Sequence, residues 1–485
     1  MTDLTNTTVT ATNDPLGLAG DAPLLNAYLE ARARMAAGHH AFHTPGHKGA
    51  TALVGTVIEG DMALAGGVDT VKLQHGWLTQ AEQRAAALYG ADVCRFSVGG
   101  STHCNQTIAL AVGAPGDTVI VSRTLHRSTL LGLVLAGLVP AWIEPEVDPR
   151  TGLPTGYAPA TVAAALAEHP HAAAVLLTDP SYVGTFSDVA EHARVAHAAG
   201  VPLVVDAAWA AHFGFHPDLP PHALAAGADA MVTSAHKALP AYSQAAMLLA
   251  RTDRLDPGRL HRAFEATHTT SPGGALMASI DAARALVQRD GERLLGEVIG
   301  VVAAARARLR AIPGVHVLEG AGVDPAKLTV SLPGTGAHGV EVEADLIAAG
   351  VPPEMADRDT IVAMVTIADD AASIARFTDA LAASIERRRG EPRPGATVAG
   401  WIVTPDQRIA PRDAFFSAVE TVPFDDAVER VSAELVALYP PGVPVLAPGE
   451  AVSAAALDAL RDAAADGVRV AYAADPTLAT LDVLR

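Results

Sequence analysis

The sequence predicts an α/β fold in which helices cover both faces of a mostly parallel β-sheet. Helical stretches alternate with short apolar runs from about residue 80 to residue 233, and such alternation is typical of parallel sheets. The runs are apolar throughout, as expected of strands that are buried on both faces. Turn sequences such as Ala114-Pro115-Gly116-Asp117 separate the two kinds of segment. The expected helices are 80–89, 102–112, 127–136, 160–168 and 189–199, and the expected strands are 93–98, 117–121, 141–143, 173–177, 202–205 and 230–233.

Segments before and after this region predict further units. A polar lead-in over 1–20 precedes a helix expected at 22–37, and the composition of 42–49 is that of a loop. From about residue 275 a long helix is followed by short strands and one more helix, which indicates a smaller α+β domain. Its expected elements are 277–310, 314–317, 327–332, 341–349 and 361–367.

A break rich in charge, Pro and Gly over 387–395 predicts a linker to a C-terminal domain. The last part of the chain contains Pro- and Gly-rich turns and one long amphipathic helix. We therefore expect four units: an N-terminal segment, a large domain, a small α+β domain and a C-terminal domain. Their expected limits are 1–40, 41–275, 276–390 and 391–485.

Charge and composition exclude several classes of partner. The 485 residues include 34 Lys and Arg against 53 Asp and Glu, a net charge of −19, so neither nucleic acid nor an anionic membrane is expected as a partner. The two cysteines, Cys94 and Cys104, form no CxxC pair, which predicts no disulfide framework and no metal site. The polar start lacks the pattern of a signal peptide, and the longest apolar stretch, 130–143, is too short to span a bilayer. We expect a soluble cytoplasmic protein.

Three sequence features at strand ends indicate one cofactor. The first is Gly99-Gly100-Ser101-Thr102-His103, which follows an expected strand and opens a helix. Backbone N–H groups at a helix N-terminus, together with Ser and Thr hydroxyls, can bind a phosphate group. An ordinary glycine turn with a Ser or Thr helix cap would explain the same residues.

The second feature is Asp206, which ends the apolar run 201–205. A carboxylate at the carboxyl end of a parallel strand lies where such sheets bind ligands, and there it could pair with a pyridinium nitrogen. A cap of the next helix is the alternative for Asp206.

The third feature is Ser234-Ala235-His236-Lys237, directly after another expected strand. A buried ammonium group without a partner is costly, and Schiff-base formation would remove the charge of Lys237. Ser234 could add a donor to a phosphate. Lys237 follows Asp206 by 31 residues, enough for one turn, one helix-sized crossover and one strand.

Together, in this order, these features predict pyridoxal phosphate. His126, in a turn after a further strand, could stack on the cofactor ring, although a surface histidine would look the same.

With these motifs the sequence resembles the Orn/Lys/Arg decarboxylases, enzymes that use pyridoxal phosphate on the aspartate-aminotransferase fold. The matching segments occur in order over most of the chain: 42–49 (FHTPGHKG), 100–102 (GST), 125–128 (LHRS), 211–217 (AHFGFHP), 234–237 (SAHK), 270–272 (TSP), 411–416 (PRDAFF), 420–423 (ETVP) and 439–444 (YPPGVP). The resemblance implies a transferase-like large domain with a mostly parallel sheet, a small α+β domain and an appended C-terminal domain. It also implies a homodimer, or a larger oligomer built from dimers, with active sites shared across the interface.

The resemblance implies a role for each matched site residue. Lys237 would bind the cofactor covalently, Asp206 would pair with the ring nitrogen, and His126 would stack on the ring. The phosphate would be held from two loops, by Gly100, Ser101, Thr102, Ser234 and His236.

The implied reaction is decarboxylation of a basic amino acid (arginine, lysine or ornithine) to the amine and CO₂. Lys237 or His236 would return a proton to Cα. A cationic substrate needs an acidic partner, and Glu420 is the candidate from its place in the ETVP match; a solvated surface glutamate is the alternative.

Two rival functions remain open at this stage. One is another reaction on the same fold, such as an aminotransferase or a Cα–Cβ lyase. Aminotransferases generally hold the α-carboxylate with an arginine of the small domain, and the candidates here are Arg306, Arg308, Arg310 and Arg376. The other rival is a non-catalytic homologue that binds the cofactor or a partner protein.

The sequence departs from the family pattern at four places. Ala235 replaces the usual Thr of Ser-Thr-His-Lys, and Asp206-Ala207-Ala208-Trp209 replaces the frequent Asp-Glu-Ala-His. The segment 69–76 follows the family only loosely, and His103-Cys104 is unusual after Ser101-Thr102. The departures at 69–78 and 103–104 leave the choice of substrate open, with arginine or lysine slightly favoured by the short form of the chain.

Overall fold

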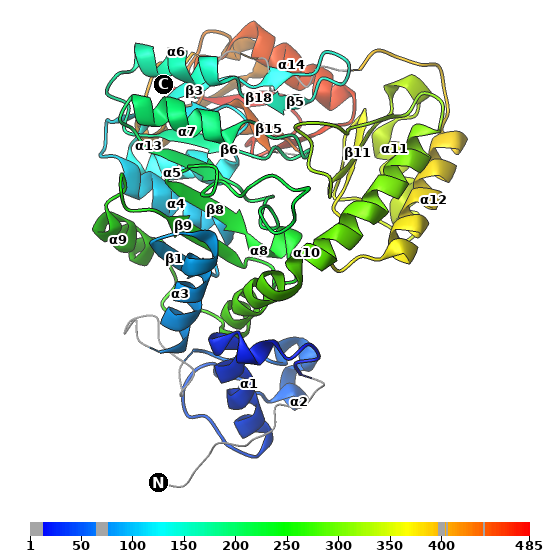
Figure 1. Cartoon of the computed structure of the whole chain (residues 1–485). Coiled ribbons are helices and arrows are strands. Elements are labelled where there is room, and N and C mark those ends of the chain that lie inside the picture. Colours follow the sequence, from blue (N-terminus) through cyan, green and yellow to red (C-terminus); the bar gives the residue numbers. More distant parts are fainter. Residues whose placement is uncertain (1–12, 65–75, 396–402, 404–405, 440–441) are drawn as a thin grey trace.

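The computed structural model describes residues 13–64, 76–395, 403, 406–439 and 442–485. A seven-stranded sheet forms its centre, flanked by helices (Figure 1). In spatial order the strands are β1 (Val93–Ser97), β9 (Ala246–Ala250), β8 (Ala230–Ser234), β7 (Leu203–Asp206), β6 (Val175–Thr178), β2 (Thr118–Ser122) and β3 (Val139–Ile143). The strands from β8 to β3 are parallel to one another, and only β9 runs antiparallel to its neighbours. The expected mostly parallel sheet is confirmed, and β9 is an addition that the sequence pattern did not predict.

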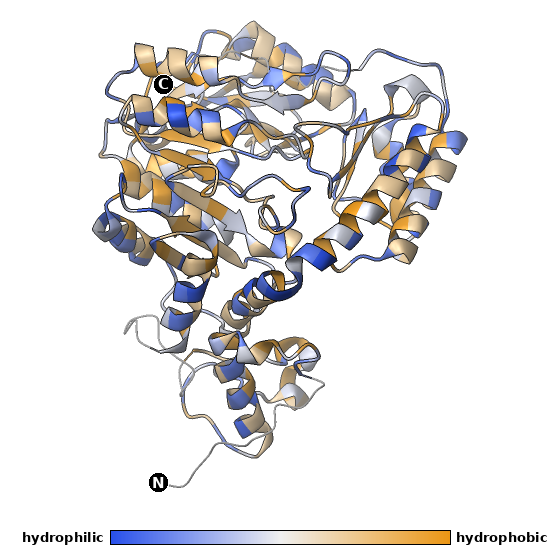
Figure 2. Ribbon diagram, in the orientation of Figure 1, coloured by the Kyte–Doolittle hydropathy of each residue, from blue (hydrophilic) through white to orange (hydrophobic). Residues whose placement is uncertain are grey.

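Successive strand residues face two different apolar cores, which explains why the strands are apolar throughout. Ile120 and Met231 pack in one core with α1 (Pro23–Ala36), α3 (Trp77–Tyr89), α6 (Pro159–Glu168) and α7 (Val189–Ala198). Val121 and Val232 pack in the other with α4 (Gly100–Val112), α5 (Arg127–Ala136) and α9 (Pro257–Thr267). Figure 2 shows the same distribution as apolar colour along the central strands. Because side chains alternate between the faces of a strand, a sheet covered on both sides needs apolar residues at every position.

The connection from Asp206 to β8, which is long enough for a helix-sized crossover, contains no helix. Residues 207–229, all of which the structure describes, form a series of turns that leads from β7 to β8. Asp206 therefore does not cap a helix. Its backbone continues into a turn in which the N–H of Ala208 donates to the Asp206 carboxylate over 3.2 Å.

A smaller unit follows along α10 (Gly274–Arg310), to the right of the main sheet in Figure 1. Its antiparallel sheet has the order β10 (His316–Val317), β11 (Leu328–Ser331), β13 (Thr360–Ala363) and β12 (Met355–Ala356). The helices α11 (Gly339–Ala348) and α12 (Ala371–Arg387) complete a separate apolar core. The first turns of α10 pack in the large core through Met277 and Ile280, and later turns pack here through Val298 and Val302. One helix thus connects the two units.

The last part of the chain has its own apolar core. Its elements are α13 (Pro411–Phe416), β14 (Val419–Pro423), β15 (Val436–Tyr439), β16 (Val443–Leu446), α14 (Ala454–Ala465), β17 (Arg469–Ala471) and β18 (Thr480–Leu484). The strands form two small sheets, β14–β18 and β16–β15–β17. We keep the unit limits 1–40, 41–275, 276–390 and 391–485 as a proposal. None of the helices in the described part of the chain has the length and apolar composition that crossing a membrane requires.

Candidate active site

A cavity of about 750 Å³ lies at the carboxyl ends of the central strands. The large unit supplies most of its wall, the small unit adds Glu354 and Met364, and the C-terminal part adds Tyr439 and Val443. This volume suits a cofactor together with a small substrate. The residues that the sequence suggested for the cofactor all line this one cavity: Gly100, Ser101, Thr102, His126, Asp206, Ser234, His236 and Lys237. Glu420 does not line it.

Asp206 is the last residue of β7, and its buried carboxylate faces the cavity. The side-chain amide of Asn105 donates to it over 2.7 Å and to the hydroxyl of Ser128 over 2.9 Å. Asn105 lies one helical turn after Ser101 on α4, a spacing that puts both side chains on one face of the helix. The sequence reasoning missed Asn105, although this spacing was visible.

Lys237 lies in the short helix α8 (Ala235–Ala238), directly after β8. Its ammonium nitrogen is 3.9 Å from the centre of the Trp209 indole ring. Burial lowers the pKa of Lys237, and the negative charges of Asp206 and Glu354 act in the opposite direction. Among the residues that the structure describes, no carboxylate lies within 4 Å of this ammonium group. The neutral, nucleophilic form of Lys237 is therefore easier to reach than in an exposed lysine.

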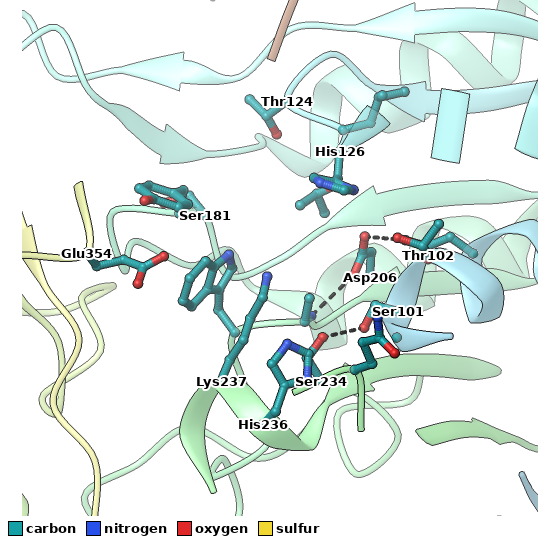
Figure 3. Close-up of a pocket in the computed structure, with 18 of the residues that line it drawn as sticks. Ser101, Thr102, Thr124, His126, Ser181, Asp206, Ser234, His236, Lys237 and Glu354 are labelled. Carbon is teal, nitrogen blue, oxygen red and sulfur yellow. Dashed lines mark hydrogen bonds between the residues drawn. The ribbon is translucent and has the colours of Figure 1, made fainter. Parts of the chain in front are cut away.

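The start of α4 forms one wall of the cavity and has features that suit an anion. Gly99 is the N-cap and makes no side-chain cap bond, so Ser101 and Thr102 are not the helix cap that the alternative interpretation required. The first turn of α4 contains no acidic residue, which leaves the positive end of the helix dipole uncompensated. Gly100 has φ 68°, a conformation that favours glycine. The hydroxyls of Ser101 and Ser234 lie 2.7 Å apart and bring two loops together (Figure 3).

His126 caps the N-terminus of α5 and lies across the cavity from Lys237 (Figure 3). Its Nδ1 accepts a hydrogen bond from the backbone N–H of Ser128 over 3.2 Å and lies 2.8 Å from the Ser128 hydroxyl. Desolvation lowers the pKa of His126, Asp206 opposes the shift, and Lys237 adds to it. A neutral ring held at Nδ1 suits stacking on a flat ligand. Because Ser128 also contacts Asn105, one hydrogen-bonded chain joins His126 to Asp206.

His236 lines the cavity, and the backbone of Ala245 contacts its ring. Its Nδ1 lies 2.9 Å from the carbonyl oxygen of Ala245, which can only accept, so Nδ1 carries the proton. Burial lowers the pKa of His236, so Nε2 tends to remain unprotonated. An unprotonated Nε2 cannot donate to a phosphate. The hydroxyls of Ser101 and Ser234 can donate without any change of protonation, and the phosphate role of His236 stays a prediction.

The structure adds a second lysine that the sequence reasoning did not nominate. The ammonium nitrogen of Lys327 lies 4.1 Å from the centre of the Trp209 ring and 5.7 Å from that of Tyr182. Burial, above all, and the charge of Lys237 lower the pKa of Lys327 to about 8. The chain contains only four lysines against 30 arginines. This scarcity was a signal in the sequence, because a lysine in a chain that otherwise uses arginine indicates that a lysine is specifically needed at that position.

Two acidic residues differ in their relation to the cavity. Glu354, just before β12, lines it and acts electrostatically on both Lys237 and Lys327. Glu420, on β14, pairs instead with Arg430, whose guanidinium also donates to the carbonyl of Leu484 over 2.8 Å. Within one chain Glu420 thus behaves as the surface glutamate of the alternative interpretation. Its substrate role stays a prediction that concerns only the cavity of a second copy.

The four arginines considered for an α-carboxylate clamp are engaged elsewhere. Arg306 donates to the carbonyl oxygens of Asp324 and Lys327, and Arg376 donates to that of Gly350. Arg308 pairs with Asp379 and Arg310 with Glu319. None of the arginines in the described part of the chain lines the cavity.

The structure shows the position of some of the residues that depart from the family pattern. His103 and Cys104 are buried on α4, where His103 contacts the Ser97 hydroxyl over 2.9 Å and the Phe264 carbonyl over 3.1 Å. Neither lines the cavity, so this departure concerns packing beneath it. Residues 69–75 lie outside the described residues.

Comparisons with known proteins identify the family and the fold of the chain. Residues 22–321 match the family model described as "Orn/Lys/Arg decarboxylase, major domain", and residues 400–464 match the C-terminal domain of the same family. The chain is 32% identical over 462 residues to an arginine decarboxylase of Halalkalibacterium halodurans, covering 92% of this chain and 94% of that protein. It is 24% identical over 557 residues to the lysine decarboxylase LdcA of Pseudomonas aeruginosa, covering 88% and 73%. The solved structure of lysine decarboxylase A from Pseudomonas aeruginosa superimposes with a TM-score of 0.81 at 20% identity, covering 98% of this chain and 82% of that one. The fold class expected from the sequence is confirmed.

Proposed function

The chain belongs to the Orn/Lys/Arg decarboxylase family, and from this premise we propose that it uses pyridoxal phosphate to remove the α-carboxyl group of a basic amino acid. One observation carries the proposal. Lys237, Asp206, His126 and the Ser101–Ser234 hydroxyl pair come from different helices, strands and turns at one sheet edge and face one cavity.

The residues of the cavity fit this cofactor at each of its polar ends. The uncompensated N-terminus of α4, with Ser101 and Ser234, would hold the phosphate. Asp206, held by Asn105, would pair with the ring nitrogen, and Lys237 would bind the aldehyde carbon. When bound, the cofactor supplies an electron sink for the pair that the departing carboxyl group leaves behind.

The side chains around the cavity would divide the remaining work. The carboxylate of Asp206 would face the ring nitrogen, and His126, whose pKa is lowered by desolvation, would cover the ring. Lys237, whose pKa is lowered by burial, is the group that we propose returns a proton to Cα. The aromatic rings of Trp209 and Tyr182 line the cavity and contact each other edge to face, and they would limit the access of water.

The substrate is proposed from charge and from the relatives. Glu354 offers a carboxylate at the cavity wall for the cationic end of a basic amino acid, and the net charge of −19 does not repel such a substrate. The relative at 32% identity is named an arginine decarboxylase, whereas the lysine decarboxylase LdcA stands at 24%. We therefore place arginine before lysine and ornithine.

The aminotransferase alternative receives less support. It requires an arginine at the α-carboxylate, and each of the four candidates in the small unit has another partner. A carboxyl group that must leave needs no such clamp.

Assembly and compartment complete the proposal. We propose a homodimer, or a larger oligomer built from dimers, because one chain exposes several large apolar side chains that a partner could cover: Phe42, Leu53, Val57, Phe415 and Phe416. We propose the cytoplasm as its compartment, since both cysteines are free and buried. Neither nucleic acid nor a membrane is proposed as a partner.

The deciding experiment separates the three candidate functions. Purified protein with added pyridoxal phosphate and a 2-keto acid as acceptor of the amino group is incubated with arginine, lysine or ornithine, and CO₂, the amine and the keto acid formed from the substrate are quantified. We expect CO₂ and amine in equal amounts, and neither from Lys237→Ala. Keto acid without CO₂ would establish the aminotransferase instead. Protein that shows no absorbance of bound cofactor, and is unchanged by Lys237→Ala, would refute the enzyme proposal.

A further inference from the structure

The turn that carries His126 lies between β2 and α5, and side chains from elsewhere hold it in place. Thr124, Leu125 and His126 all line the cavity from this turn. The Thr124 hydroxyl contacts that of Tyr157 at 2.7 Å. The four residues from Arg123 to His126 belong to neither a strand nor a helix, so their position depends on such contacts.

The first residue of the turn, Arg123, is clamped by the C-terminal part of the chain. Its guanidinium donates to both carboxylate oxygens of Glu450, over 2.5 and 3.0 Å, and to the carbonyl of Val445 over 3.0 Å. Arg123 is 0% exposed and Glu450 is 1% exposed. The paired charges are therefore shielded from water, and either one alone would remain buried without a counter-charge. The planar two-point contact also fixes the direction of the arginine, which a single contact would not.

The residue that follows the turn, Arg127, makes a second contact with the C-terminal part of the chain. The guanidinium of Arg127 lies 4.3 Å from the centre of the Tyr472 ring. Between these two contacts, Val443 on β16 reaches the cavity wall itself. The segment that holds Arg123 thus continues directly into the cavity.

We propose that Glu450 is a positioning residue, which acts through Arg123 to set the place of His126 over the cofactor. The C-terminal part of the chain would then be a component of the cofactor site, although no atom of Glu450 reaches the cavity. This inference rests on the proposed function, because it takes His126 to face pyridoxal phosphate.

A purely structural role for the pair makes a different prediction. If Arg123 and Glu450 only join two parts of the chain, removing the charge of Glu450 lowers stability and leaves cofactor affinity unchanged. If Glu450 positions His126, the same change weakens cofactor binding, and the effect depends on His126 being present. A double-mutant cycle between the two residues separates these cases.

The experiment measures equilibrium binding of pyridoxal phosphate to the cofactor-free protein, by quenching of tryptophan fluorescence. The variants are Glu450→Gln, His126→Ala and the double variant. Glu429→Gln is the matched control, because Glu429 is an exposed partner of Arg408 in the same part of the chain. Thermal unfolding of each cofactor-free variant is recorded in parallel. Should Glu450→Gln not fold, Glu450→Asp replaces it, since it keeps the buried charge but shortens the side chain that contacts Arg123 by one methylene group.

We expect Glu450→Gln to raise the dissociation constant about 10-fold in the presence of His126 and less than about 2-fold in the His126→Ala background. Glu429→Gln should match the wild type. An unchanged dissociation constant in Glu450→Gln, or an equal loss in both backgrounds, would overturn the inference, and the same criteria apply to Glu450→Asp. Wild-type protein that does not bind pyridoxal phosphate at all would instead refute the proposed function.

Discussion

The ammonium nitrogen of Lys237 lies 3.9 Å from the centre of the Trp209 indole ring. The same ring is approached to 4.1 Å by Lys327, which comes from the small unit. An indole face attracts cations, so Trp209 stabilises two ammonium groups in a region that offers them little water. This arrangement places the half-buried Lys237 and the buried Lys327 next to one another and leads to the first two predictions.

Replacing Lys237 should abolish the reaction while leaving the fold intact. We expect Lys237→Ala to lower the rate of CO₂ release by at least about 1,000-fold, because the chain loses both its attachment point and its proton donor. Lys237→Arg is the matched variant: it keeps the positive charge but provides no amine to bind the cofactor. Both variants should lose the absorbance of covalently bound cofactor. Substantial activity in either one would contradict the role of Lys237.

Replacing Lys327 should stabilise the protein near neutral pH. Its pKa is about 8 in the folded chain, against 10.5 for an unperturbed lysine, so between these values the unfolded chain binds more protons than the folded one. Stability therefore rises with pH across this window, and below pH 8 the full cost of the buried charge is present. We expect Lys327→Met to raise the free energy of unfolding by about 3 kcal/mol at pH 7, as measured by urea denaturation.

The pH dependence provides the control for that prediction. Relative to Lys327→Met, the wild type should gain stability between pH 8 and pH 10.5 until the difference disappears. Lys327→Arg should keep the destabilising buried charge at pH 8 and at pH 10.5, because arginine does not lose its proton in this range. A Lys327→Met variant that is less stable than the wild type at pH 7 would show that Lys327 has a stabilising partner.

The amide of Asn105 should matter for cofactor binding through Asp206. Its hydrogen bond of 2.7 Å reaches a buried carboxylate, and bonds to charged groups are among the stronger ones. We expect Asn105→Ala to weaken binding of pyridoxal phosphate about 10-fold or more, measured by titration of cofactor-free protein. Asn26→Ala is the comparison, since Asn26 makes an exposed bond of 3.0 Å to Glu30 on α1. Equal effects of the two substitutions would mean that Asn105 does not act on Asp206.

Glu354 should affect both substrate affinity and pH dependence. We expect Glu354→Gln to raise KM for a cationic amino acid about 10-fold and to change kcat less. Because Glu354 raises the pKa of Lys237, its loss should lower that pKa. Cofactor attachment needs neutral Lys237. The acid limb of the pH profile of cofactor attachment should therefore move to lower pH in Glu354→Gln.

Glu420→Gln distinguishes the two acidic candidates. An effect on KM in Glu420→Gln alone would assign the substrate carboxylate to Glu420, reaching the cavity of a second copy. An effect in Glu354→Gln alone would assign it to the carboxylate that lines the cavity of its own chain.

Much of the large unit was predictable because its strands carry a simple signal. Strands buried on both faces are apolar throughout, and each predicted run became a strand with shifts of a few residues at its ends. The strand β9 was missed because its sequence, Ala-Met-Leu-Leu-Ala, consists of residues that favour helices. The helix α12 was within reach, since Asp370 caps it and Ile374, Phe377 and Leu381 have helical spacing. The conformation after Asp206 did not follow from chain length, which allowed a helix-sized crossover, because residues 207–229 form turns instead.

The sequence by itself determined the group of residues at the strand ends: Ser101, His126, Asp206, Ser234 and Lys237. Each follows an apolar run, and the carboxyl ends of parallel strands must meet at one edge of the sheet, so their proximity follows from local pattern alone. Only tertiary structure brings Glu354 to the cavity wall, Lys327 to the Trp209 ring and Glu450 to Arg123. They lie in other units, and the contact between units depends on how whole surfaces pack. Hydrophobic periodicity along the chain carries no information on that packing. The contact between Arg123 and Glu450 is therefore decided by the tertiary structure alone.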